Sequence, residues 1–451
     1  MGRDSTGTAF PEMSPAITAV SRSYAWLIFT LSFGLLLSDV MSRQVLNAVF
    51  PLLKAEWLLS DAQLGSLSGI VALMVGLLAF PLSLLADRWG RVRSLVIAAT
   101  MWSLATLGCA VSASYGEMFL ARFMVGVGEA AYGSVGLALI LSVFPIRMRA
   151  TLSGVFLAGG SFGSLLGVSV GGVVAQHLGW RWAFGVMGVF GLTLAVIYGI
   201  VVTEKRLGSN ISTRSGASGE RAPIRTLLPR LFSSVSVVCV YIGSGMQLFI
   251  VWALLAWMPS FLNRYYAMPS AKAGLVAGVF ALIGGTGMIL CGIVADRLSR
   301  KVVSRKWTVA IACSLASLVL LMFGFQLPPG PLQLVLIGAG TLLAAGTAGP
   351  AAAIVANLTP PAIAATAFAT LTLANNLLGV APGPSVTGML SDRIGLLGAL
   401  QMIPLVAIAG SAAFAIGKFY YAKDLRRLRL LPDMVPDPSR SHELHRTADP
   451  S

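Results

Sequence analysis

Long apolar runs recur along this chain from Tyr24 to Tyr420, separated by short polar or Pro- and Gly-containing breaks. A helix needs about 20 apolar residues to cross the hydrocarbon core of a bilayer. The runs therefore predict an all-α membrane protein with twelve transmembrane helices. The expected ranges are 24–51, 62–86, 94–113, 118–144, 151–176, 182–203, 233–258, 271–294, 307–325, 331–356, 362–390 and 396–420.

Composition agrees with a surface that faces lipid. Only 11% of the residues are charged, whereas a soluble domain carries roughly 25%. This excludes a cytosolic enzyme, a secreted disulfide scaffold and a nucleic-acid-binding domain. We expect no metal, no cofactor and no enzymatic activity, because the four cysteines sit in apolar runs without CxxC pairing and the histidines lie outside the spans. The cysteines are Cys109, Cys239, Cys291 and Cys313.

The positions of Lys and Arg predict the orientation, since cytoplasmic loops carry an excess of both. Of the 32, 25 fall in the termini and in the breaks on the same side. The opposite side has five, namely Lys54, Arg181, Arg264, Lys272 and Arg393. Both termini are thus expected in the cytoplasm of a bacterial cell, with the chain crossing the inner membrane many times. The net charge of +15 follows mostly from this bias. No cleaved signal peptide is expected.

The longest break divides the spans into six and six. It covers 204–232, is rich in Ser, Gly and Arg, and has the composition of a flexible linker. We expect a cytoplasmic tail at 1–23, a first bundle at 24–203, a second bundle at 233–420 and a cytoplasmic tail at 421–451. The halves also repeat each other, because Ala-Asp-Arg and trailing basic residues follow the second span of each, in LADRWGRVR and GIVADRLSRK.

This pair of loops resembles the signature of the major facilitator superfamily, Gly-x-x-x-Asp-Arg-x-Gly-Arg-Arg/Lys, over a chain match of about 24–420. Ser83 and Val92 depart from the pattern. The resemblance implies two pseudo-symmetric six-helix bundles. It also implies a gating role, through contacts with neighbouring helices, for Asp87, Arg88, Arg91, Asp296 and Arg297.

Charges inside two spans of the first half are the main functional signal, since ionisable groups in a membrane are costly. Asp39, Arg43 and Asn47 recur at intervals of four residues. Arg122 and Glu129 are seven residues apart, and Tyr132 follows Glu129 by three. Each set lies on one helical face, so the charges can converge on a shared polar cavity.

The chemistry of these groups suggests separate roles. A guanidinium is always charged and suits carboxylate or phosphate, which makes Arg43 and Arg122 candidate anion binders, with Asn47 and Tyr132 beside them. A buried carboxyl can take up a proton, so Glu129 is the first candidate proton carrier and Asp39 the second. The alternative is a pair of structural salt bridges, although buried ion pairs are a poor source of stability.

The second half offers polar groups instead of charges: Gln247, Asn375 and Asn376, with the aromatic residues Tyr241, Trp252 and Trp257. A cavity charged on one side and polar on the other suits an organic anion with an apolar or hydroxylated body. Gly159, Gly163, Gly167 and Gly171 form a stripe that permits close helix packing. Pro382 and Pro384 predict a kinked or broken helix.

Two families within the superfamily compete. The Arg-x6-Glu pattern and GWRWAF resemble the anion:cation symporters, in which the matching Arg and Glu bind the anion and couple the proton. LSDAQLGSLSG and GVGEAAYG resemble bacterial spinster proteins, some of whose relatives export lysolipids. Both usually have adjacent Asp-Arg in the first span, whereas this chain has Ser42-Arg43 with Asp39 one turn earlier.

The sequence thus predicts a monomeric, proton-coupled secondary transporter that imports a small organic anion by alternating access. It needs the lipid bilayer, protons and a small-molecule substrate as partners, and no nucleic acid. An ion gradient is the expected energy source, because no nucleotide-binding fingerprint is present. Export of an amphiphile such as a lysolipid is the alternative within the same class, and a non-transporting membrane sensor is the alternative outside it.

Overall fold

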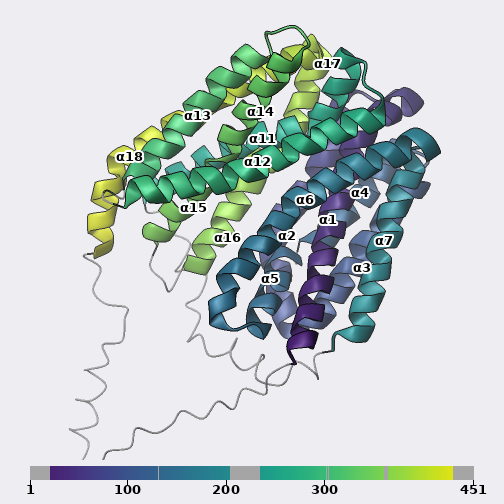
Figure 1. Cartoon of the computed structure of the whole chain (residues 1–451), viewed down its shortest axis with the longest axis horizontal. Helices are drawn as coiled ribbons and strands as arrows, with labels where there is room; N and C mark the ends of the chain where they lie inside the picture. Colours follow the sequence, from purple (N-terminus) through teal and green to yellow (C-terminus); the bar gives the residue numbers. More distant parts are fainter. Residues whose placement is uncertain are drawn as a thin grey trace, which may run out of the picture.

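The computed structural model describes residues 21–130, 132–203, 234–300, 302, 304–359 and 364–429. The expected linker at 204–232 and most of the two expected tails lie outside these residues. Within them every regular element is a helix (Figure 1). The first bundle contains α1 (Arg22–Trp57), α2 (Asp61–Trp89), α3 (Arg91–Val111), α4 (Tyr115–Glu129), α5 (Tyr132–Val143), α6 (Ile146–Leu178) and α7 (Trp180–Val201).

The second bundle begins at Val235. It contains α11 (Val235–Tyr266), α12 (Ser270–Ser299), α13 (Arg305–Gly324), α14 (Pro331–Ala345), α15 (Ala348–Asn357), α16 (Ala364–Asn375), η2 (Asn376–Val380), α17 (Pro382–Met402), η3 (Ile403–Leu405) and α18 (Val406–Arg429). In the part of the chain that is described, ten helical stretches are long and apolar enough to cross a membrane. The all-helical architecture is confirmed, and the count of twelve spans stays a prediction.

The differences from the expected spans have local causes. The span expected at 118–144 is covered by α4 and α5, between which lie Ala130 and residue 131, the latter outside the described residues. The spans expected at 362–390 and 396–420 form one long apolar stretch, interrupted where Gly395 has a φ of 78°. Glycine adopts this backbone conformation without a steric penalty. A local turn at a single residue is therefore enough to reverse the chain.

The prolines near 382 interrupt a helix, as expected. Pro382 has no N–H to continue an α-helical ladder, and the preceding residues of η2 form a π-helical turn. The Ala381 N–H donates to the Asn376 carbonyl at 3.0 Å, five residues back. Such π-helical turns are frequent at functional sites.

The glycine stripe of α6 packs against α1. A Cβ added at Gly163 would lie 2.8 Å from Cβ of Val40, and one at Gly167 would lie 2.8 Å from Cα of Met41. Real side chains do not approach so closely, so these positions accept only glycine without a shift of the helices. The stripe therefore permits the close helix approach that its spacing predicts.

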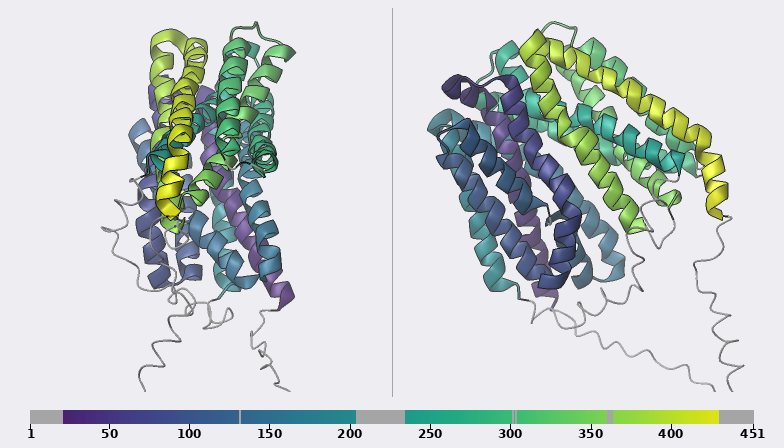
Figure 2. Two further views of the ribbon diagram at one scale, coloured as in Figure 1. Left: turned by 90° about the vertical axis from the view of Figure 1, so that its left-hand side faces the viewer. Right: turned by 180° about the vertical axis from the view of Figure 1, so that it is seen from behind.

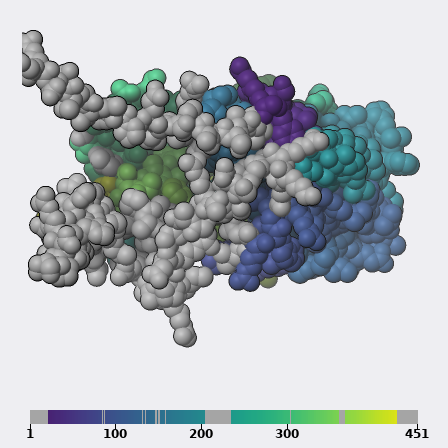
Figure 3. Space-filling view, turned by 90° about the horizontal axis from the view of Figure 1, so that it is seen from below, coloured from purple at the N-terminus to yellow at the C-terminus, as the bar shows by residue number. Residues whose placement is uncertain are grey.

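The two bundles lie side by side (Figure 1). We call the end where α1 begins and α18 ends the proximal end, and the opposite end the distal end. Seen from the proximal end, atoms of the first bundle gather on one side and the green atoms of the second on the other (Figure 3). The bundles meet along two seams, α2 with α17 and α6 with α12.

The hydrophobic cores differ between the two ends. One buried cluster in the distal half contains residues of both bundles, including Phe50 of α1 and Trp257 of α11, whose ring centroids are 5.2 Å apart. Toward the proximal end each bundle has a core of its own, around Trp102 in the first and Trp307 in the second. The ribbons also diverge toward the proximal end (Figure 2). The bundles are thus packed together distally and separately proximally.

Candidate functional site

Arg43 of α1 and Glu129 at the end of α4 form an ion pair inside the first bundle. Nε and Nη2 of Arg43 lie 3.0 Å and 2.5 Å from the same oxygen, Oε2 of Glu129. The Glu129 side chain is 1% exposed and that of Arg43 is 16% exposed. A buried carboxylate has lost its hydration, and the guanidinium replaces part of it. Each charge is therefore stabilised mainly by the other, and only the guanidinium of Arg43 keeps some exposure to solvent.

A second carboxyl joins this pair. Asp39, one turn before Arg43 and 8% exposed, is in electrostatic contact with both partners. Among the described residues, Oδ1 of Asp39 and Oε1 of Glu129 are buried without a hydrogen-bond donor. The two carboxyls are in electrostatic contact with each other. Asp39 and Glu129 thus share a buried site with Arg43, and the buried Arg122 contributes a second positive charge to it.

Arg122 of α4 forms its hydrogen bonds with backbone carbonyls. Its Nε, Nη1 and Nη2 donate to the carbonyls of Leu67, Ser42 and Arg43 at 3.2, 3.0 and 3.3 Å. The side chain is completely buried and in electrostatic contact with Glu129. In this conformation its guanidinium ties α4 to α1 and α2 and positions the backbone of Arg43. Its expected role as a direct anion binder stays a prediction.

Asn47 lies in a buried polar chain next to these charges. Its Nδ2 donates to Oε1 of Gln44 at 2.6 Å, and its Oδ1 accepts from Ser68 at 3.4 Å. Nε2 of Gln44 continues the chain to Ser164 of α6 at 3.4 Å. The sequence analysis missed Gln44, Ser68 and Ser164. Gln44 could have been found from its spacing, because it precedes Asn47 by three residues on the same helical face.

Tyr132, the first residue of α5, belongs to the core of the first bundle. Its hydroxyl donates to the Ser32 carbonyl, and its ring stands edge-on to Trp102 with centroids 5.1 Å apart. The residue is completely buried and in electrostatic contact with Asp39. Tyr132 therefore lies in the hydrophobic core beside the charged site, where it packs against the other helices of the first bundle.

Among the described residues, no hydrogen bond or ion pair joins Gln247, Asn375 or Asn376 to these charges. Gln247 is buried within the second bundle, where its Nε2 donates to Oγ of Ser314. Asn376 donates to the Thr372 carbonyl at 2.9 Å and packs against Gly76 of α2. Oδ1 of Asn375 is buried without a donor among the described residues. Asn376 is thus the member of this set that is placed at the junction of the bundles.

The aromatic residues of α11 have packing roles. Trp257 is fully buried and donates from Nε1 to the Pro384 carbonyl at 3.0 Å. Tyr241 donates from its hydroxyl to the Ala367 carbonyl at 3.3 Å. Trp252 packs against a small buried cluster that contains Ala72 of α2. These contacts anchor α11 to its neighbours.

The gating-motif residues lie at the proximal end. Arg88 and Arg297 are exposed and Arg91 is half-buried, whereas the side chain of Asp87 is outside the described part. The Asp296 side chain is 72% exposed, and its Oδ1 lies 3.3 Å from Nζ of Lys306 in α13. The gating role of these five residues stays a prediction.

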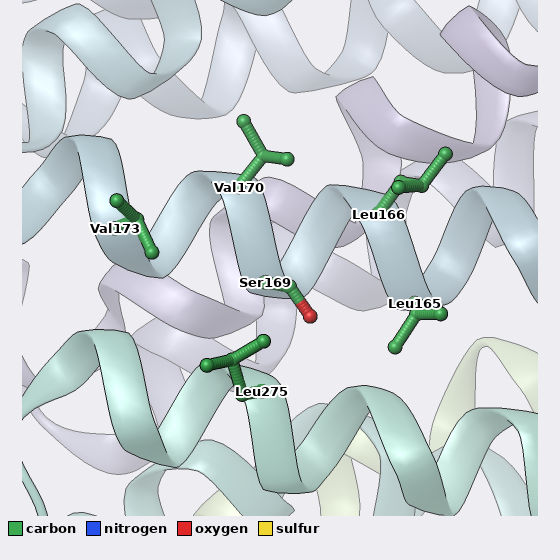
Figure 4. A pocket seen from close by; sticks show the side chains of 6 residues that line it. All are labelled: Leu165, Leu166, Ser169, Val170, Val173 and Leu275. Atoms are coloured by element: carbon green, nitrogen blue, oxygen red, sulfur yellow. The ribbon is translucent and has the colours of Figure 1, made fainter.

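An apolar groove lies on the seam between α6 and α12. Its volume is about 370 Å³. Figure 4 shows Leu165 and Ser169 of α6 directed toward α12, from which Leu275 faces them. The only polar atom of these side chains, Oγ of Ser169, lies 3.5 Å from the Gly274 carbonyl. The lining residues are Leu165, Leu166, Ser169, Val170, Val173 and Leu275.

Comparison with known proteins agrees with this architecture. The sequence model of the family named Major Facilitator Superfamily matches residues 31–384 of this chain. A gallate transporter of Pseudomonas putida is 24% identical, over 91% of this chain and 94% of that protein. Protein spinster homolog 1 of Xenopus laevis is 25% identical, over 92% of this chain and 84% of that protein.

A solved structure has the same fold. It is a bacterial homologue of the human lysosomal transporter Spinster, in an inward-facing and unoccupied conformation. The TM-score is 0.79 at 18% identity, covering 90% of this chain and 99% of that one. At this identity the similarity concerns the fold alone.

Proposed function

The chain belongs to the Major Facilitator Superfamily, and on this basis we propose that it is a secondary transporter that couples protons to the uptake of a small organic anion. It is a multi-pass membrane transporter of that superfamily. In the proposal it lies in a bacterial inner membrane as a monomer, with both termini in the cytoplasm, and works by alternating access. The similarity to a gallate transporter, gallate being an aromatic carboxylate, supports the substrate class.

The observation that carries the proposal is the double contact of Arg43 with a single oxygen of Glu129. A guanidinium that binds a carboxylate of its own protein can exchange it for the carboxylate of a substrate. Protonation of Glu129 removes the negative charge that holds Arg43. The freed guanidinium then has the geometry and the charge to bind an anionic substrate.

Charge balance explains why the proton and the anion travel together. Asp39, Arg43 and Glu129 share a buried site, where each additional net charge is costly. The entry of one proton with one monoanion leaves the net charge of the site unchanged. The entry of either one alone changes that charge by one unit.

The remaining polar groups support binding of the body of the substrate. The buried chain of Gln44 and Asn47 offers amide donors and acceptors beside Arg43, and Asn376 lies where α2 meets the second bundle. Arg122 supports the site through the carbonyls of Ser42 and Arg43. Together these groups suit an anion with a hydroxylated body.

The test is proton flux in proteoliposomes that contain a pH-sensitive dye, with gallate, galactonate and a lysolipid as probes. We expect a carboxylate to drive acidification of the lumen, and Arg43→Ala to abolish the response. Glu117→Gln serves as the matched control, because Glu117 is an exposed acid at the start of the same helix as Glu129. Absence of flux with every carboxylate, in correctly folded protein, would contradict the proposal.

Export of an amphiphile is the second candidate, and the apolar groove between α6 and α12 favours it. Leu166, Val173 and Leu275 are between 38% and 52% exposed, so an alkyl chain could enter from the bilayer side. The similarity to a spinster protein points the same way. A response to the lysolipid alone, weakened by a polar residue in the Leu166→Gln variant, would favour this candidate over the organic anion.

A further inference from the structure

The two seams between the bundles are built alike. A Cβ added at Gly388 of α17 would collide with the Asp61 carbonyl at the start of α2, and one at Gly172 of α6 would collide with the Ser270 carbonyl at the start of α12. Asp61 and Ser270 precede the aspartate of their Ala-Asp-Arg motifs by the same number of residues. The internal repeat therefore extends to the contacts between the bundles.

Each seam also has a side chain that caps a helix of the other bundle. Oδ1 and Oδ2 of Asp392 accept from the N–H groups of Asp61 and Ala62 at 2.7 and 2.9 Å. At the other seam Oε1 of Gln176 accepts from the N–H of Ala271 at 2.9 Å. The first N–H groups of a helix have no hydrogen-bond partner within the helix. At the distal end, each bundle supplies a side chain that accepts such hydrogen bonds from a helix of the other bundle.

The seams differ in charge, because only the α2 seam has an ionic cluster among the described residues. Asp61 is 2% exposed, and Lys54 of α1 lies 2.5 Å from its Oδ1. Arg264 of α11 donates from Nη2 to Oδ1 and from Nη1 to Oδ2, both at 2.7 Å. Ser391 of α17 donates to Oδ2 at 2.5 Å. We call Lys54, Asp61, Arg264, Ser391 and Asp392 the Asp61 cluster.

The Asp61 cluster accounts for two positive charges that do not follow the cytoplasmic excess of Lys and Arg. Lys54 and Arg264 are among the five Lys and Arg residues expected outside the cytoplasm. Both converge on Asp61, which is supplied by the first bundle, whereas Arg264, Ser391 and Asp392 come from the second. A bidentate ion pair with a buried carboxylate is among the stronger polar contacts in proteins. Separation of the bundles at the distal end must break it.

We propose that the Asp61 cluster is the distal gate of the transporter, which holds the two bundles together on that side, while the neutral α6–α12 seam parts without breaking an ion pair. The inference rests on alternating access in the proposed function. When the distal side opens, the buried carboxylate of Asp61 becomes hydrated, which offsets part of the lost contacts. Removal of the charge of Asp61 should therefore favour the distally open state.

The test measures the distance between the distal ends directly. The background is full-length protein from which the four native cysteines have been removed. Spin labels are attached at Ala113→Cys, between α3 and α4, and at Gln326→Cys, after α13. Electron–electron double resonance then measures the distance between the two labels. Both positions are exposed at the distal end. We expect Asp61→Asn to raise the ratio of the long-distance to the short-distance population by roughly tenfold, because removal of one charge from a buried ion pair weakens the pair and leaves its partner uncompensated.

Further variants separate a gate from general loosening. Asp392→Asn removes a different, exposed member of the cluster and should shift the same ratio in the same direction. Glu56→Gln is the matched control, since Glu56 pairs with Arg181 and Trp180 at the same end but within the first bundle. Gln176→Ala is the equivalent change at the neutral seam, and both controls should leave the ratio within twofold.

Two outcomes would overturn the inference. One is an unchanged distance distribution in both Asp61→Asn and Asp392→Asn, in protein with unaltered melting. The other is an equal shift in Gln176→Ala. The measurement needs no substrate, so a distal end that opens in Asp61→Asn supports the gate even if no organic acid drives proton flux.

Discussion

Arg43 makes both of its contacts with Glu129 through a single oxygen, Oε2, and leaves Oε1 of that carboxyl buried without a donor among the described residues. A bidentate pair would engage both oxygens. The open oxygen is therefore the position at which a proton can be added while Arg43 is still in place. In the proposed function, protonation of Glu129 weakens its ion pair with Arg43 and thereby releases the guanidinium.

Replacement of Glu129 by Gln should make the rate of transport independent of pH. The amide keeps the volume but cannot exchange a proton. Uphill accumulation driven by a proton gradient should fall by about tenfold or more, whereas exchange of substrate across the membrane should persist. Uptake and exchange in proteoliposomes between pH 5.5 and 8.0 measure both, with Glu117→Gln as control. An unchanged pH profile would remove Glu129 from the coupling.

Arg43→Lys should weaken substrate binding and keep the fold. Lysine retains the charge but loses the planar fork, so we expect a loss of affinity of roughly tenfold, about 1.4 kcal/mol. Isothermal titration with gallate or galactonate measures the change. Arg181→Lys is a suitable control, because Arg181 is 45% exposed and pairs with Glu56 at the distal end. Equal affinity in wild-type protein and Arg43→Lys would argue against bidentate binding.

Arg122→Ala tests the two roles that the sequence and the structure suggest. The substitution leaves three buried carbonyls with one donor fewer, and each lost hydrogen bond to a charged group costs about 1.5–3 kcal/mol. We expect a clearly lower melting temperature in detergent and a weakened binding site. If binding is lost while the melting temperature is unchanged, Arg122 contacts the anion directly, as the sequence analysis predicts.

Gly167→Ala should destabilise the first bundle, because its Cβ would lie 2.8 Å from Cα of Met41. Overpacking of this kind costs about 1–3 kcal/mol. The matched control is Gly160→Ala in the same helix, where no atom lies within 4 Å of the added Cβ. Thermal unfolding of the two variants, compared with the parent protein, gives the difference. Equal melting temperatures would mean that α6 and α1 separate at no cost.

Much of the fold follows from local properties of the sequence. The apolar runs predict membrane helices because a span must satisfy its own backbone hydrogen bonds. The prolines near 382 and the glycine spacing of α6 also act locally, through a missing N–H and a missing Cβ. The spacing of Asp39 and Arg43 placed both on one face of α1, and their electrostatic contact in the structure agrees with it.

The sequence alone thus determined the membrane helices, the internal repeat and the charges within the first half. The tertiary structure decided which of these groups meet. Arg122 and Arg43 look alike in sequence, but one binds backbone carbonyls and the other binds Glu129. Asp61 and Arg264 lie in different bundles, and nothing in their own helices indicates that they pair. The physical reason is that spacing sets the face of a helix that a residue occupies, whereas the packing of the helices sets what that face contacts.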